Sequence, residues 1–175
     1  TPNLEEDLKR RDFTINAMAY NPREGLIDIF GGEQDLAAGI IRCVGNARER
    51  FSEDALRIMR AVRFSAQLGF AIEKNTARAA GELAENLRKI SAERIQTELV
   101  KLVVSDHPDY LRKAYELGIT GVVLPEFDRM METGQNNKHH CYTVGEHTIV
   151  AMQNIQPRKV LRLAVLLHDV AKPVC

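Results

Sequence analysis

The spacing of apolar residues changes near Phe51, and this change constrains the fold more than any other feature of the 175-residue chain. Before it, between Asn16 and Asn46, short β-prone runs alternate with turn residues such as Asn-Pro and Gly-Gly. After it, apolar residues recur every three or four positions, which is typical of amphipathic helices. We therefore predict a mainly α protein: a small α+β part, too poor in strands to complete a sheet, followed by helices.

Turn residues and apolar periodicity place the boundaries of these elements. Strands are expected at residues 17–20, 26–30 and 40–44, and a short helix at 33–38. A long helix is expected to begin at a Ser52 cap, with acids in its first turn, and to end at Gly69. Further helices are expected at 74–87, 91–103, 108–117, 144–155 and 160–171, and a linker at 130–138.

Composition narrows the class of protein. Basic and acidic residues are equal in number, 24 of each, so contact with a nucleic acid must come from local clustering of charge. With 45% hydrophobic residues, the chain can form one large domain or two or three small ones. Its three cysteines lack a CxxC spacing, and no apolar run is long enough to span a membrane. We therefore expect a cytoplasmic protein in a reducing compartment, without membrane contact.

Charged residues recur at three-residue steps at Asp54, Arg57, Arg60 and Arg63. In a helix this spacing sets them on neighbouring turns and brings Glu53 and Asp54 within reach of Arg57. One interpretation is a solvent-facing lattice of ion pairs. The other is a template for nucleotide bases. Adenine and cytosine both present an amino donor beside a ring-nitrogen acceptor, so one carboxylate plus one guanidinium would accept A and C and reject G and U.

A second charged cluster, Lys9-Arg10-Arg11, stands just before Asp12 and Asn16. Three consecutive cations are costly to bury. With the two polar residues nearby, they could bind a triphosphate and a ribose hydroxyl. A basic turn at the end of a strand is the alternative.

Asp28 and Asp35 flank the glycine pair Gly31-Gly32. Two glycines permit a tight turn from strand to helix, and Asp35 could cap or brace that turn. From the residues alone, a structural duty is the favoured interpretation.

His147, His168 and Asp169 fall on two neighbouring helical patterns. Imidazole nitrogens and a carboxylate suit divalent transition metals, and the apolar run before His168 would hold them in a dry setting. Histidines that are simply packed are the alternative. A full metal site needs another ligand, for which His139 and His140 are weak candidates.

Four segments resemble consecutive motifs of the bacterial-type (class II) tRNA nucleotidyltransferase and poly(A) polymerase family. Residues 10–17, RRDFTINA, are similar to its nucleoside-selecting motif, and residues 26–42 are similar to the motif between its head and neck. Residues 53–64, EDALRIMRAVRF, resemble its base-template helix, and residues 91–99, SAERIQTEL, resemble the neck motif that braces this helix. Order and spacing match over residues 5–126, and residues 139–173 resemble an HD domain that some members carry.

The resemblance implies a role for each matching residue. Asp54 and Arg57 are the implied base-reading pair, and Glu53 would orient Arg57. Arg60 would reach toward phosphate. The ribose and triphosphate contacts would come from Arg10, Arg11, Asp12 and Asn16.

Outside the nucleotide pocket, the resemblance implies a hinge and a metal site. Asp28 and Asp35 would serve a hinge that lets one pocket accept CTP and then ATP. In the HD module, His147, His168 and Asp169 match metal-binding positions and could hold a divalent transition metal.

Family members also hold two Mg²⁺ ions on a pair of aspartates ahead of the Arg-Arg-Asp motif. No Asp-x-Asp pair occurs in this sequence, which opens without methionine. We therefore expect a fragment. Its expected parts are residues 1–50 as the C-terminal part of a nucleotidyltransferase head, 51–130 as a helical neck that binds nucleotide and RNA, and 131–175 as the start of an HD domain.

The resemblance implies that the intact enzyme adds C and A nucleotides from CTP and ATP to the 3′ end of tRNA or another RNA, with Mg²⁺ as cofactor. This chain alone is expected to be inactive. Two alternatives stay open: an HD-type metal-dependent phosphohydrolase, and a helical module that binds RNA or nucleotide without catalysis.

Overall fold

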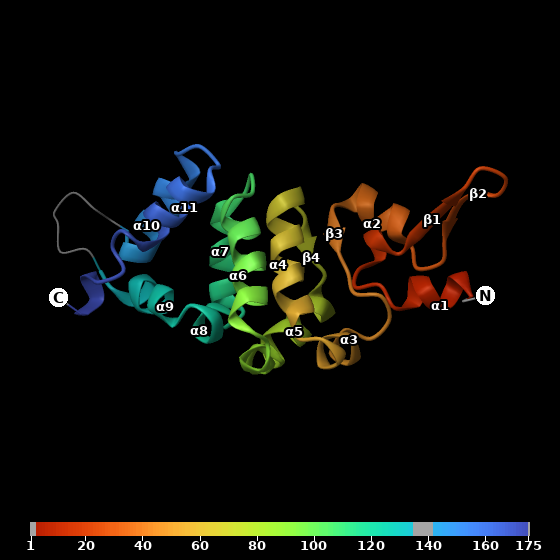
Figure 1. Ribbon diagram of the computed structural model, residues 1–175, viewed down its shortest axis with the longest axis horizontal. Coiled ribbons are helices and arrows are strands. Elements are labelled where there is room, and N and C mark those ends of the chain that lie inside the picture. The colour runs from red at the N-terminus through yellow and green to blue at the C-terminus, as the bar shows by residue number, and fades with distance from the viewer. Residues whose placement is uncertain (1–2, 135–141, 175) are drawn as a thin grey trace.

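The protein is elongated, with short strands near the N-terminus and helices over the rest of its length (Figure 1). The computed structural model describes residues 3–134 and 142–174. Along the long axis, the middle is formed by α4 (Leu56–Leu68) and α6 (Ala92–Val103), and one end by α10 (Val144–Gln153) and α11 (Lys159–Leu167). The expected mainly α fold with a small α+β part is confirmed. No helix among the described residues is both long and apolar enough to cross a lipid bilayer.

The N-terminal part is a hairpin between two short helices. After α1 (Leu4–Lys9) and a 3₁₀ turn at Thr14–Asn16, β1 (Met18–Asn21) pairs antiparallel with β2 (Gly25–Asp28). The next element, α2 (Gly32–Ala38), begins at the glycine pair. A Cβ atom on Gly32 would lie 2.2 Å from the carbonyl oxygen of Thr14, so the close approach of α2 to the 3₁₀ turn requires glycine there.

A second, parallel pair of strands links this part to the helices. β3 (Ile40–Ile41) pairs with β4 (Ala71–Ile72), which lies about thirty residues further along the chain. The expected strand at 40–44 is thus shorter than predicted. β4 was not predicted, because a two-residue strand carries no periodicity of its own.

Two helices replace the single long helix expected from Ser52. The first, α3 (Ala47–Glu53), begins at Asn46, whose side chain caps it. Asp54 then has an extended backbone (φ −147°, ψ 103°), and its carboxylate accepts a hydrogen bond from the N–H of Leu56 at 3.1 Å, where α4 begins. The predicted start at Ser52 is therefore wrong, because Ser52 lies within α3 and the extended backbone at Asp54 separates α3 from α4.

The other helices partly follow the predicted boundaries. They are α5 (Lys74–Glu82), α7 (Leu111–Glu116), α8 (Thr120–Val123) and α9 (Pro125–Glu132), with 3₁₀ turns at Ala84–Lys89, Pro108–Tyr110 and Lys172–Val174. The helices expected at 74–87 and 108–117 are each divided. The linker expected at 130–138 overlaps the end of α9, and its residues 135–138 lie outside the described part.

The helices α4 and α6 pack against each other at the centre of a continuous hydrophobic core. Across their interface, Nε of Arg63 donates to Oε2 of Glu98 at 2.8 Å, and the two side chains are 9% and 6% exposed. Arg63 also lies over the ring of Phe64, with 3.7 Å between the guanidinium carbon and the ring centroid. This buried ion pair fixes the relative position of the two helices whose N-terminal ends border the site described below.

Candidate functional site

An open cleft of about 440 Å³ lies where the segment after α1 meets the first turns of α4 and α6. It brings together every residue of the predicted nucleotide-binding set except Glu53, which lies behind Arg57. The lining residues are Arg10, Arg11, Asp12, Asn16, Asp54, Leu56, Arg57, Arg60 and Arg94. Five arginines outnumber two aspartates in the lining, and Asp7 and Glu53 outside it pair with Arg11 and Arg57, so the cleft keeps a smaller positive surplus, which suits an anionic ligand.

Arg57 is held in place from behind the cleft. Its Nη1 donates to Oε2 of Glu53 at 2.8 Å and to the carbonyl oxygen of Arg50 at 3.0 Å, and its Nη2 lies 3.3 Å from the carbonyl oxygen of Arg10. Its side chain is 18% exposed. These contacts come from two segments far apart in the sequence, so the guanidinium has a fixed position at the edge of the cleft.

Asp54 lies in the break between α3 and α4 and is held from the other side. Its Oδ1 accepts from the N–H of Leu56, and its Oδ2 accepts from Nη2 of Arg94 on α6 at 3.1 Å. With 36% of its side chain exposed, the carboxylate still faces solvent in the cleft. The i,i+3 spacing predicts contact between Asp54 and Arg57. In the structure, Asp54 forms an ion pair with Arg94, and Arg57 forms one with Glu53.

Two arginines of the site are not found by reasoning from the sequence. Arg94 stands in the motif at 91–99, whose resemblance implies a brace but does not identify the side chain that reaches the cleft. Arg50 lies behind the cleft and shares Oε2 of Glu53 with Arg57, at 3.1 Å. The contact of Arg94 could not be found from periodicity, because Arg94 lies forty positions from Asp54. Arg50 and Glu53 are three residues apart on α3, so their i,i+3 spacing is the signal that could have identified Arg50.

Asp12 is buried at the floor of the cleft. Its Oδ1 accepts from its neighbour's N–H and from Nδ2 of Asn16 at 3.4 Å, and its Oδ2 accepts from Nε and Nη2 of Arg60 at 2.7 and 2.6 Å. In this structure Arg60 therefore pairs with Asp12, whereas the resemblance predicts that Arg60 extends toward phosphate. Arg11 pairs with Asp7, and Arg10 is exposed without an ion pair among the described residues.

The two aspartates of the predicted hinge tie the turn around the glycine pair. Asp28 accepts from the N–H groups of Glu33 and Gly32 at 2.9 and 2.8 Å, and these hydrogen bonds, led by that of Glu33, lower the pKa of its carboxyl group. Asp35 is 7% exposed and accepts from the hydroxyl of Thr14 at 2.7 Å and from Nε of Arg42 at 3.0 Å. Both contacts are structural, and the hinge role stays a prediction.

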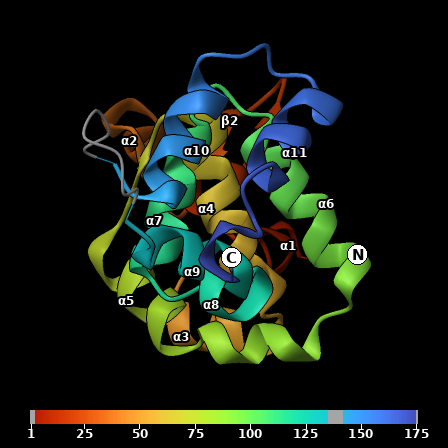
Figure 2. The same ribbon diagram turned by 90° about the vertical axis from the view of Figure 1, so that its left-hand side faces the viewer.

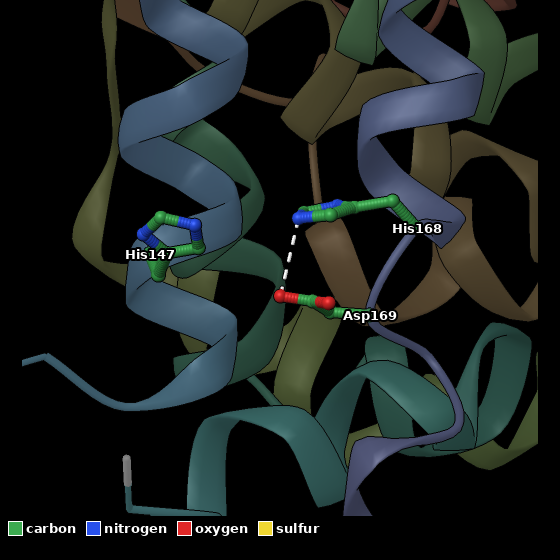
Figure 3. Close-up of side chains that lie close together, drawn as sticks. All are labelled: His147, His168 and Asp169. Carbon is green, nitrogen blue, oxygen red and sulfur yellow. Dashed lines mark ion pairs between the residues drawn. The ribbon is translucent and has the colours of Figure 1, made fainter. Parts of the chain in front are cut away.

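The predicted metal residues come together at the far end of the molecule (Figure 3). His147 lies on α10, and His168 and Asp169 directly follow α11, with one ligand atom from each within 4.8 Å of the others. Nδ1 of His168 lies 2.5 Å from the carbonyl oxygen of Val165, which favours a proton on Nδ1 and leaves Nε2 as the ligand atom.

This donor set fits a divalent transition metal, although Lys172 competes for the carboxylate of Asp169. Its Oδ2 lies 3.1 Å from Nε2 of His168 and 2.7 Å from Nζ of Lys172. The adjacent Glu146 is unavailable as a fourth ligand, because both its oxygens accept from Arg112. His139 and His140, the other candidates, lie outside the described residues.

Comparison with known proteins identifies the family. The family model for the poly A polymerase head domain matches residues 1–42, and the model described as the probable RNA- and SrmB-binding site of polymerase A matches residues 69–131. The chain therefore belongs to the poly(A) polymerase and tRNA nucleotidyltransferase family, as its motifs predicted. Neither match includes residues 139–173, so the HD domain stays a prediction.

Within this family, similar proteins include CCA-adding enzymes. That of Leuconostoc mesenteroides is 57% identical over 102 residues, which cover 58% of this chain and 25% of the relative. The solved Bacillus stearothermophilus enzyme in complex with CTP matches 97% of this chain and 55% of its own, with a TM-score of 0.68 and 29% identity. The match to the Thermotoga maritima enzyme complexed with tRNA covers 97% of this chain and 44% of that enzyme's chain, with a TM-score of 0.70 and 28% identity. The chain thus spans a quarter of that curated relative.

Proposed function

We propose that this chain is the nucleotide-selecting and RNA-binding part of a cytoplasmic enzyme that adds C and A nucleotides from CTP and ATP to the 3′ end of tRNA. One observation carries the proposal: the carboxylate of Asp54 and the guanidinium of Arg57 lie at one open, positively charged cleft, each held by contacts on its far side. The similarity to CCA-adding enzymes, which include complexes with CTP and with tRNA, supports it.

The cleft can select bases by matching donors and acceptors. The Asp54 carboxylate accepts from the exocyclic amino group of cytosine or adenine, and the Arg57 guanidinium donates to the adjacent ring nitrogen. Guanine and uracil present a carbonyl beside a ring N–H, so like groups would face each other and stay unpaired. Arg10 and Arg11, both exposed at the mouth, would meet the triphosphate.

Catalysis by this family uses divalent metal, for which we propose Mg²⁺. The expected metal-binding pair is two aspartates separated by one residue, and the sequence contains no such pair. We therefore assign no catalytic step to the residues of this chain. The proposal concerns selection and binding.

Binding of the four nucleoside triphosphates to this chain tests the proposal. ATP and CTP are expected to bind roughly tenfold to a hundredfold more tightly than GTP and UTP, because a mismatched base leaves polar groups of the cleft unpaired at about 1–3 kcal/mol each. Isothermal titration calorimetry under one set of salt conditions measures this. Equal affinities for all four nucleotides would show that the cleft binds phosphate without reading the base.

A second candidate function, metal-dependent phosphohydrolysis in an HD module, is favoured by the convergence of His147, His168 and Asp169. If these residues bind metal, purified protein is expected to carry close to one equivalent of transition metal, and His168→Ala to lose it. Elemental analysis measures the content, with His107→Gln as control because His107 follows α6 and packs on Tyr110. If the wild-type protein contains no metal after incubation with Zn²⁺ or Mn²⁺, the phosphohydrolase function is excluded.

A further inference from the structure

The carboxylate of Asp12, at the floor of the nucleotide cleft, has its hydrogen-bonding positions filled by protein donors. Its Oδ1 accepts from the N–H of Phe13 at 2.9 Å and from Nδ2 of Asn16 at 3.4 Å. Its Oδ2 accepts twice from Arg60, from Nε at 2.7 Å and from Nη2 at 2.6 Å. A carboxylate offers about four such positions in all. Asp12 therefore accepts from a ligand hydroxyl only after one of these donors has left.

Arg60 is held to Asp12 by its side chain alone, and it lines the cleft. Its side chain is 35% exposed, and Asp12 is its one ion-pair partner among the described residues. The other oxygen of Asp12 is held more firmly, because the N–H of Phe13 belongs to the backbone of the next residue. An anion in the cleft can therefore separate Arg60 from Asp12 without any change in the backbone.

The helix that carries Arg60 is held on several sides. Figure 2 shows α4 in the middle of the molecule with α6 beside it, and the two helices pack against each other. Met59 and Ala61, the neighbours of Arg60 in the sequence, are buried in the hydrophobic core. A change of position at Arg60 is therefore a rotation of its side chain and not a movement of α4.

We propose that Arg60 blocks Asp12 until a ligand phosphate draws the guanidinium away, and that Asp12 then accepts a hydrogen bond from a ribose hydroxyl. The inference rests on the proposed function for the identity of the ligand, a ribonucleoside triphosphate. A triphosphate competes well with one carboxylate, because it carries more negative charge and also binds guanidinium through two parallel hydrogen bonds. Recognition of the ribose is thereby coupled to recognition of the phosphates.

Comparison of ribonucleotides with their deoxy analogues tests the proposal. Either 2′-deoxy-ATP or 3′-deoxy-ATP is expected to bind about tenfold more weakly than ATP, because it lacks a hydrogen bond to a charged acceptor. Nucleosides carry no phosphate, so adenosine and its two deoxy analogues are expected to bind with equal affinity. Isothermal titration calorimetry measures the nucleotides, and NMR chemical-shift titration measures the more weakly bound nucleosides.

Two further measurements separate the release of Asp12 from better placement of the ribose by an attached triphosphate. Inorganic pyrophosphate is expected to give adenosine a preference over one deoxy analogue, because it draws Arg60 away without a bond to the nucleoside. Arg60→Ala is expected to give the same preference without pyrophosphate. The matched control is Arg11→Ala, since Arg11 also lines the cleft but pairs with Asp7. The control variant should bind the three nucleosides equally.

Three results would overturn the proposal. Equal affinities for ATP and both deoxy nucleotides would show that Asp12 does not contact the ribose. Wild-type protein that prefers adenosine to a deoxy analogue in the absence of pyrophosphate would show that the hydroxyl displaces Asn16 and leaves Arg60 in place. The third is equal binding of the three nucleosides both with pyrophosphate and by Arg60→Ala, because it would show that Arg60 does not block Asp12.

Base selection is judged separately, from the affinities for the four nucleoside triphosphates. Equal affinities for all four, together with a hydroxyl preference that depends on phosphate, would refute base selection and leave the role of Arg60 standing. Tight binding of ATP and CTP alone, with a hydroxyl preference that does not depend on phosphate, would refute the role of Arg60 and leave base selection standing.

Discussion

Replacing Arg57 with alanine is expected to abolish discrimination between CTP or ATP and the other two nucleotides. The guanidinium is fixed by Glu53 and by the carbonyl oxygens of Arg50 and Arg10, and its removal takes away the donor that would face the ring nitrogen of the base. The lost hydrogen bond to the ring nitrogen is worth about 1–3 kcal/mol, so a preference of tenfold to a hundredfold should fall to a few-fold at most.

Two measurements check this expectation. In the full-length enzyme that carries this sequence, primer extension with each nucleotide alone gives the ratio of kcat/KM values, and calorimetry on this chain gives the ratio of affinities. Arg88→Ala is the control, because Arg88 is exposed and pairs only with Glu85 among the described residues. Unchanged selectivity in both assays would remove the base-reading role from Arg57.

The parts of the site that could be predicted from the sequence are those whose signal is local. The Arg-Arg-Asp segment and the charged stripe of α4 identified all but two of the cleft's lining residues, Leu56 and Arg94. The end of α4 was also predicted, because Gly69 adopts a left-handed conformation (φ 68°) that glycine alone takes without strain.

The parts that could not be predicted depend on contacts between distant segments. The pairing of β3 with β4 and the contact of Arg94 with Asp54 form only when the chain has folded. The break at Asp54 was missed for a different reason. Acids after a serine fit the first turn of a helix as well as they fit a junction between two helices, and the local pattern cannot decide between them.

Truncating Glu98 is expected to destabilise the fold far more than the loss of an exposed ion pair. Glu98→Ala leaves the guanidinium of Arg63, 9% exposed, without its counter-ion in the α4–α6 interface. Removing one partner of a buried ion pair costs about 3–5 kcal/mol, a large fraction of the total stability of a typical domain. For a chain of this size the melting temperature should fall by roughly 6–20 °C. Thermal unfolding followed by circular dichroism measures it.

The exposed pair Arg88–Glu85 provides the control, because its side chains are 65% and 73% exposed and Glu85→Ala should cost less than about 1 kcal/mol. The double substitution Arg63→Met with Glu98→Leu should recover most of the lost stability, since it removes the uncompensated charge and keeps the volume. If the Glu98→Ala and Glu85→Ala proteins melted at the same temperature, the Arg63–Glu98 pair would not hold α4 and α6 together.

Because Arg94 lies one turn before Glu98 on α6, the Glu98→Ala variant should also loosen the contact of Arg94 with Asp54 and weaken nucleotide selection even below its melting temperature.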